Sequence, residues 1–217
     1  MLSYGFKIEV WGEYACFSRP ELKVERVSYD VMTPSAARGI LEAVMWKPAI
    51  RYIIDEIAVC SPIRFENLRR NEVAFKANAF EPKAANSDRQ QRAAIILKDV
   101  RYVLTAHFEM TSKAGETDNE GKFTDMIRRR LEKGQNFHTP YLGTREFPAN
   151  VKLIGEYETT PAPIDETRSL GLMLHDIDYI IETDKNGMEI VKEFKPTYFI
   201  AVMKSGVIDL RNVEVLQ

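Results

Sequence analysis

The most sharply bounded segment of the chain is a predicted helix that lies between two predicted strands. Thr33-Pro34 supplies a capping side chain followed by proline at the first helical position. Trp46-Lys47-Pro48 ends the helix, because proline disfavours a helical conformation in the residue before it. Apolar and polar residues alternate over residues 6–10 and again over residues 50–54, which is typical of strands. The chain therefore opens with a strand, a helix and a strand, and its fold must contain both helices and strands.

The next part of the chain repeats this pattern after a basic interruption. Residues 67–92 form a polar, positively charged excursion that we interpret as a hairpin or long loop projecting from the sheet. A strand over residues 100–110, a helix over residues 122–133 closed by Gly134, and a strand over residues 141–147 follow. The order β-α-β-β-α-β is that of the ferredoxin-like fold used by RNA-recognition domains, although many unrelated proteins share it.

The character of the chain changes at Pro148. Pro161-Ala162-Pro163 marks a loop, and two strands are expected over residues 170–181 and 197–210, the second with a turn at Lys204-Ser205-Gly206. We therefore predict an α+β protein in two parts. Residues 1–149 form a ferredoxin-like domain with a projecting basic hairpin, and residues 150–217 form a small C-terminal antiparallel β extension.

The charge of the chain is nearly balanced but unevenly distributed. The formal net charge of −2 over 217 residues argues against indiscriminate binding of nucleic acid. Residues 150–217 hold 7 basic and 12 acidic side chains, whereas residues 1–149 hold 23 and 20. A polyanion is therefore expected to meet the first two thirds of the chain, where local basic patches matter more than the sum.

The cysteines and the apolar segments indicate a cytoplasmic protein. Cys16 and Cys60 have no spacing suited to zinc or redox chemistry, and two thiols do not make a disulfide framework. No apolar run reaches the roughly 20 residues that a membrane-spanning helix needs. The first ten residues alternate like a strand, so we expect neither a signal peptide nor a membrane partner.

The best candidate for a phosphate-binding site is Asn119-Glu120-Gly121-Lys122-Phe123. It opens the second helix, where free backbone N–H groups favour an anion and a lysine after glycine can project into solvent. The same helix carries Arg128, Arg129, Arg130 and Lys133. The alternative is an ordinary solvated helix face opposite the apolar stripe formed by Phe123, Met126, Ile127 and Leu131.

Other catalytic chemistry has little support. Of the three histidines, His107 and His175 suit structural hydrogen bonds, while His138 lies in a loop beside basic residues where it could touch a substrate. There is no nucleophile elbow, P-loop or G-x-G-x-x-G, and the carboxylates do not cluster as a two-metal nuclease requires. We therefore expect no metal and no cofactor. RNA can be cut without a metal by its own 2′-hydroxyl if groups exchange protons and a cation stabilises the phosphorane.

Several segments occur together in the order seen in one known family. They are Gly12-Glu13-Tyr14-Ala15-Cys16-Phe17, Val27-Ser28-Tyr29, Ile40-Leu41-Glu42-Ala43, Trp46-Lys47-Pro48, Arg89-Gln90-Gln91-Arg92, Ala106-His107-Phe108-Glu109, Gly121-Lys122 and Leu142-Gly143-Thr144-Arg145-Glu146-Phe147. Jointly they resemble the subtype I-C (Dvulg) branch of the fifth family of CRISPR-associated Cas proteins. The resemblance covers most of residues 4–150 and is looser afterwards.

The resemblance implies a fold, an activity and partners. Members of the branch have a ferredoxin-like RNA-binding domain and a C-terminal β extension. They cut the precursor CRISPR RNA at the base of each repeat hairpin without metal, then stay on the 5′ handle as a subunit of the Cascade complex. The expected partners are therefore the CRISPR repeat RNA and the other subunits of a type I-C Cascade, namely its backbone and large subunits.

The resemblance also points to three active-site positions, of which this chain keeps one. Lys122 matches, but Met45 stands where the family commonly has tyrosine or histidine, and Phe123 where it commonly has histidine. Neither side chain exchanges a proton, so Tyr14, Tyr29 or His138 would have to serve as acid and base, while Phe123 could stack on a base. Losing acid–base help costs about 100- to 10,000-fold in rate.

Two hypotheses follow. The first is a metal-independent endoribonuclease in which Lys122 stabilises the transition state. The second is a catalytically weak or inactive subunit that holds the crRNA handle and supports Cascade assembly. Under both, the expected RNA contacts are Arg38, Trp46, Lys47, Arg69, Arg70, Arg89, Arg92, Arg128, Arg129 and Arg145. The alternatives are that Trp46 belongs to the core and that Arg145 pairs near Glu146.

Overall fold

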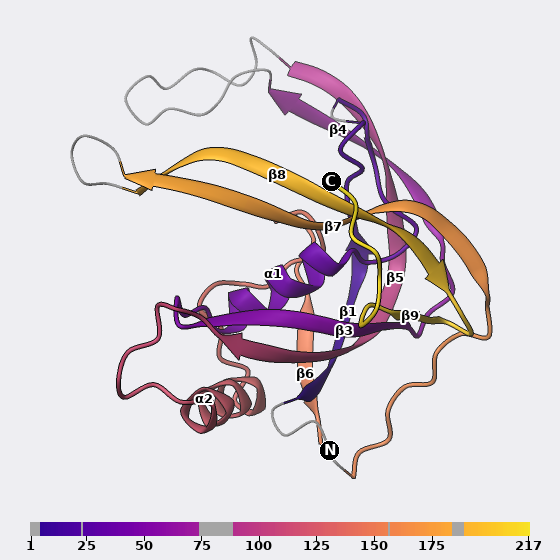
Figure 1. The fold of residues 1–217 in the computed structure, drawn as a ribbon. Helices are drawn as coiled ribbons and strands as arrows, with labels where there is room; N and C mark the ends of the chain where they lie inside the picture. Colours follow the sequence, from indigo (N-terminus) through magenta and orange to yellow (C-terminus); the bar gives the residue numbers. More distant parts are fainter. Residues whose placement is uncertain (1–4, 23, 74–88, 156, 184–188) are drawn as a thin grey trace.

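The computed structural model describes residues 5–22, 24–73, 89–155, 157–183 and 189–217 (Figure 1). Two helices and nine strands occur within these residues. In chain order they are β1 (Phe6–Ala15), β2 (Arg26–Val27), α1 (Pro34–Val44), β3 (Ile50–Val59), β4 (Phe65–Val73), β5 (Arg89–Met110), α2 (Glu120–Glu132), β6 (Asn150–Ile154), β7 (Arg168–Thr183), β8 (Glu189–Met203) and β9 (Val207–Asp209). The predicted α+β class is confirmed.

The main sheet is built around β5. Its strand order is β6-β1-β5-β3-β9 with antiparallel neighbours, and β2 and β4 also pair with β5. The edge strands β6 and β9 come from the part of the chain beyond residue 149, so this sheet is not confined to residues 1–149. The division of the chain into two domains stays a prediction.

The predicted basic hairpin is present. β4 pairs antiparallel with the first half of β5, from Phe65 opposite Leu97 to Val73 opposite Arg89, and extends away from the helices (Figure 1). Exposed and half-buried side chains alternate along β4, which is typical of a two-stranded stem. Lys76 and Lys83, which the sequence places in the same excursion, lie outside the described residues.

The strand predicted over residues 141–147 is wrong. This segment forms a compact loop instead, in which the Leu142 N–H donates to the Phe147 carbonyl and the Cys16 N–H donates to the Leu142 carbonyl. The chain turns at Gly143, whose φ of 84° suits glycine and whose Cα lies against the backbone of Cys16. The edge strand that follows α2 is β6, which begins at Asn150.

Both predicted helices are confirmed, and their caps explain their bounds. The Thr33 side chain accepts the Ala36 N–H at the start of α1, with Pro34 as the first helical residue. Asn119 caps α2 in the same way by accepting the Lys122 N–H, so this helix begins at Glu120, two residues earlier than expected. α2 buries Phe123, Ile127 and Leu131, the stripe that the sequence indicates.

The strands β7 and β8 form a separate two-stranded sheet that covers α1. Figure 1 shows α1 between this hairpin and the main sheet, and α1 contacts both β3 and β7. Met173, Phe199 and Met203 are buried, while Leu172 and Ile200 on the other face are exposed. The strands predicted over residues 170–181 and 197–210 are confirmed, and the turn at Lys204-Ser205-Gly206 joins β8 to β9.

Candidate functional site

Lys122 is fixed at the start of α2 by its neighbours. Its ammonium Nζ lies 2.7 Å from Oδ1 of Asp118, and the other Asp118 oxygen accepts the Gly115 N–H at 3.0 Å. The hydrogen bond from Lys122 is the main reason why the pKa of Asp118 lies below its usual range. The Lys122 side chain remains 45% exposed. A fixed, solvent-accessible cation therefore sits where the free N–H groups of the helix also favour an anion.

The two substituted family positions are buried, and one of them, Phe123, is next to this lysine in the chain. Met45 is 1% exposed and ends α1, where its carbonyl accepts the Tyr52 hydroxyl at 2.7 Å. Phe123 is 3% exposed, and its ring meets Phe108 edge to face with centroids 6.4 Å apart. The interpretation of Phe123 as a base-stacking residue is therefore wrong, because its ring is enclosed by the core.

The end of α1 lies along α2 and brings further candidates together. The Arg130 guanidinium donates to the Val44 carbonyl at 2.8 Å, and the His138 N–H donates to the Ala43 carbonyl at 3.2 Å. Beyond them, Trp46 is 55% exposed, so the alternative that it belongs to the core is wrong. Lys47 is exposed as well, and its charge helps to lower the pKa of Asp118.

These contacts define what we call the α1–α2 surface: Trp46, Lys47, Asp118, Lys122 and His138. It combines two cations, an exposed indole and an exposed imidazole. Asp118 is the member that the sequence reasoning missed. The signal was available, because an aspartate four residues before a lysine at a helix start is a well-known helix-stabilising pair.

The two tyrosines considered as proton donors or acceptors lie elsewhere. Tyr14 is opposite Lys98 in the register of β1 and β5, beside the base of the β4–β5 stem, where Phe65 is opposite Leu97. The charges of Glu66 and Glu13 raise the pKa of Tyr14, which disfavours its role as a base. Tyr29 is 2% exposed. Of the three candidates, only His138 is brought to the α1–α2 surface.

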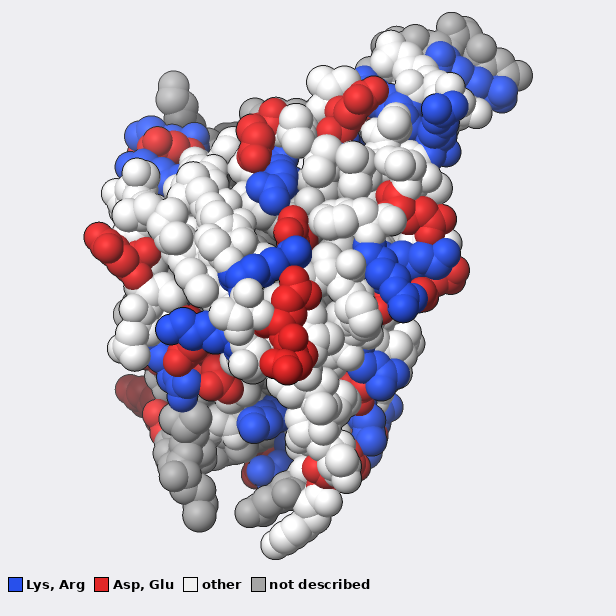
Figure 2. All heavy atoms as spheres, turned by 90° about the vertical axis from the view of Figure 1, so that its right-hand side faces the viewer, with Lys and Arg blue, Asp and Glu red and all other residues white. Residues whose placement is uncertain are grey.

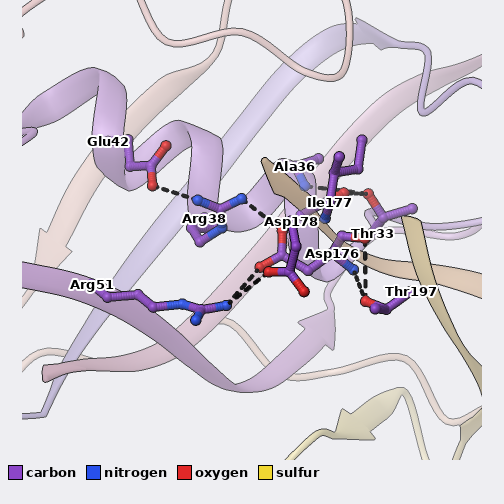
Figure 3. A network of polar contacts seen from close by, with 10 residues as sticks. Thr33, Ala36, Arg38, Glu42, Arg51, Asp176, Ile177, Asp178 and Thr197 are labelled. Atoms are coloured by element: carbon purple, nitrogen blue, oxygen red, sulfur yellow. Dashed lines mark hydrogen bonds and ion pairs between the residues drawn. The ribbon is translucent and has the colours of Figure 1, made fainter. Parts of the chain in front are cut away.

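Arg38, a predicted RNA contact, is paired within the protein. One terminal nitrogen lies 2.6 Å from Glu42 and the other 2.6 Å from Asp176 of β7 (Figure 3). Arg51 reaches the second oxygen of Asp176 at 3.5 Å and also approaches Asp178. Both terminal nitrogens of Arg38 are thus paired, one within α1 and one with β7, which argues against a contact with phosphate.

The arginines of the β4–β5 stem are partly engaged within the protein. Arg70 pairs with Glu146 and Glu72, and Arg92 pairs with Glu72 at 3.7 Å. The other predicted RNA contacts, Arg69, Arg89, Arg128, Arg129 and Arg145, are exposed. Figure 2 shows basic and acidic side chains interspersed over the face that it presents, so the charge pattern favours local contacts over one extended basic patch.

Among the residues that the structure describes, no group of three or more His, Cys, Asp or Glu side chains is arranged to hold a metal ion. Within the same residues, no helix is long and apolar enough to cross a membrane.

Comparison with known proteins gives consistent matches. The model of a family of CRISPR-associated proteins, Cas5 of the Cas5d type, matches residues 5–211. A protein named CRISPR pre-crRNA endoribonuclease Cas5d from Mannheimia succiniciproducens is 48% identical over 221 residues, which cover 94% of this chain and 93% of that protein. A protein of the same name from Thermus thermophilus is 54% identical over 143 residues, which cover 66% of this chain and 61% of that protein.

Solved structures agree. A crystal structure of a CRISPR-associated protein superposes with a TM-score of 0.68 at 25% identity, covering 97% of this chain and 93% of the other. A functionally uncharacterized protein from Streptococcus mutans reaches the same TM-score and the same coverage at 23% identity, which supports the fold alone. The resemblance seen in the sequence is confirmed: the chain belongs to the CRISPR-associated Cas5 family, in its Cas5d branch.

Proposed function

We propose that the chain is a metal-independent endoribonuclease. It binds the repeat hairpin of precursor CRISPR RNA, cuts at the hairpin base, and stays on the 5′ handle as a subunit of Cascade. The observation that carries this proposal is the 48% identity, over 94% of the chain, to a protein named pre-crRNA endoribonuclease. The exposed Lys122, held at a helix start by Asp118, supports it from the structure.

We also propose a ferredoxin-like core made of β1, α1, β3, β5, α2 and β6. The strand order β6-β1-β5-β3, with α1 between β1 and β3 and α2 between β5 and β6, supports this arrangement. The core then ends after β6 rather than at residue 149. The hairpin β7–β8 serves as the C-terminal extension, with β9 returning to the sheet.

The α1–α2 surface suggests how the cut proceeds. The 2′-hydroxyl of the nucleotide before the cut loses its proton and attacks the adjacent phosphate, and the 5′-oxygen of the next nucleotide leaves and takes up a proton. The products are a 2′,3′-cyclic phosphate and a 5′-hydroxyl. The Lys122 ammonium stabilises the extra negative charge of the phosphorane. His138 supplies the exposed imidazole of this surface, a group that can accept or donate a proton.

The second candidate function is a catalytically weak or inactive subunit that binds the handle and supports Cascade assembly. One observation favours it: Met45 and Phe123 are buried and carry no exchangeable proton. Binding by Lys47, Trp46 and Lys122 does not depend on these two positions. The two functions differ in whether the bound repeat RNA is cut.

Incubation with the cognate repeat RNA, with and without EDTA, separates the two. We expect cleavage in EDTA with a 2′,3′-cyclic phosphate at the new end, and loss of cleavage in Lys122→Ala. Lys133→Ala, at the other end of α2, is the matched control and should cut normally. Cleavage that disappears only on chelation refutes the metal-independent mechanism, while tight binding without any cleavage supports the second function.

A further inference from the structure

A cleft of about 590 Å³ lies between α1, the loop at residues 141–143 and β7. Its walls combine hydroxyl groups with aromatic rings, namely Ser18, Thr33, Ser35, Trp46, Tyr141 and Tyr179. Trp46 and Tyr179 are both more than half exposed, at 55% and 56%. Aromatic faces beside a few convergent polar groups are typical of sites for small flat molecules.

The charges around the cleft disfavour an anion. Its one cation, Arg38, is paired with two carboxylates that also line the cleft, Glu42 and Asp176 (Figure 3). The Glu42 side chain is 30% exposed and still offers acceptor capacity to a ligand. Arg51 also reaches Asp176, so the lining carboxylates and the guanidiniums balance, and Arg38, the cation among the lining residues, is already paired. A phosphate therefore finds no unengaged cation among these residues, whereas a neutral group that donates hydrogen bonds can use the carboxylate of Glu42.

The cleft adjoins the α1–α2 surface at Trp46. The next residue, Lys47, lies near Asp118 and Lys122, as its effect on the pKa of Asp118 indicates. An RNA strand whose phosphates contact Lys47 and Lys122 therefore passes the indole of Trp46. Single-stranded RNA is commonly recognised by bases that leave the stack and lie against aromatic side chains.

We propose that this cleft receives one unpaired base of the repeat RNA, and that the base carries an exocyclic amino group. The base lies beside Trp46, and its amino group donates to Glu42. Uracil presents a carbonyl oxygen in place of the amino group and is disfavoured by the carboxylate. The inference rests on the proposed function, because the ligand is the same RNA.

Gly39 offers a way to fill the cleft without disturbing the protein. It lies in α1 and lines the cleft, and a Cβ added there would meet nothing within 4 Å. Gly39→Phe therefore places a ring in the space assigned to the base. Gly39→Ala is the matched control, because it makes the same backbone change and leaves the cleft open. Phenylalanine and alanine both have a higher helix propensity than glycine.

The test measures binding of the cognate repeat RNA and of a series of its variants. In each variant one unpaired nucleotide is replaced by an abasic one. Gly39→Phe should weaken binding of the intact RNA about 10-fold, within the range of 5- to 150-fold expected for one stacked base. Gly39→Ala should stay within about twofold. One RNA of the abasic series should bind equally well to the wild-type protein and to Gly39→Phe. Uracil at the same position should weaken binding to the wild-type protein as much as the abasic nucleotide does.

Three outcomes overturn the inference while leaving the proposed function intact. One is Gly39→Phe binding and cutting like the wild type; the second is an abasic series in which no position removes the difference between the two. The third is uracil accepted at the position as well as the natural base. A wild type that neither binds nor cuts the repeat RNA refutes the proposed function, and the inference with it.

Discussion

At the scale of single residues, the catalytic potential depends on which side chains reach the surface. Lys122 does so because Asn119 and Asp118 fix the first turn of α2, whereas Met45 and Phe123 are directed into the core. The sequence identified Lys122 and the missing proton donors. It did not reveal that Arg38 forms ion pairs with Glu42 and Asp176, because Asp176 lies 138 residues away along the chain.

His175 provides a pH-dependent prediction at this scale. Burial lowers its pKa below the ordinary value of about 6.5, and its ring packs edge to face on Phe199. The folded state therefore binds this proton less readily than the unfolded state. The stability that neutral His175 contributes is present above about pH 6.5 and is lost as the pH falls through its lower folded pKa.

We expect the thermal unfolding midpoint to decrease between about pH 7 and pH 5, and His175→Gln to flatten part of that decrease. The measurement is a series of melts followed by circular dichroism. His138→Gln, whose ring is exposed, should leave the profile unchanged. An identical profile for His175→Gln and the wild type would contradict the assignment.

At the scale of elements, the hairpin β7–β8 is held on α1 by charges as well as by apolar contacts. Arg38 bridges Glu42 of α1 and Asp176 of β7, and all three side chains are 30% exposed or less. The sequence predicted both secondary-structure elements that this contact joins, the helix α1 and the strand β7. It could not predict that β7 packs on α1. Hydrophobic periodicity shows which face of a helix is buried, but it does not show which other element covers that face.

Arg38→Met should destabilise the protein by roughly 2 kcal/mol, because the partly buried carboxylate of Asp176 then loses the positive charge of Arg38. The measurement is urea unfolding. Lys195→Met is the control, because it removes an exposed pair with Glu193 and should cost less than about 1 kcal/mol. Equal stability of the two variants would mean that the Arg38 bridge does not hold the hairpin.

At the scale of the whole molecule, the near-neutral charge limits what long-range attraction contributes to RNA binding. The chain carries 30 basic and 32 acidic residues, and many arginines are paired within the fold. Affinity must then come from a few local phosphate contacts. The sequence indicated where basic residues concentrate, but pairing of Arg70 with Glu146, 76 residues apart, required the structure.

Salt dependence tests this view. Lys47→Ala should weaken binding of the repeat RNA and reduce the slope of log K against log salt by about 0.7 to 0.9, the value for one phosphate contact. Arg38→Met should leave the slope unchanged, because its guanidinium is already neutralised. Filter binding between 50 and 300 mM salt, roughly the range over which counterion release is measured, gives both slopes. A larger loss of slope in Arg38→Met would assign the phosphate contact to Arg38 instead.

The position of β6 and β9 in the chain has a consequence for biosynthesis. These strands cover the β1 edge and part of the β3 edge of the sheet, yet they are synthesised after β1, β3 and β5. At about 5–20 residues per second, the 60 residues from 150 to 209 take roughly 3–12 s to emerge. During that interval the nascent sheet exposes unpaired strand edges, the surfaces through which strands of different chains associate.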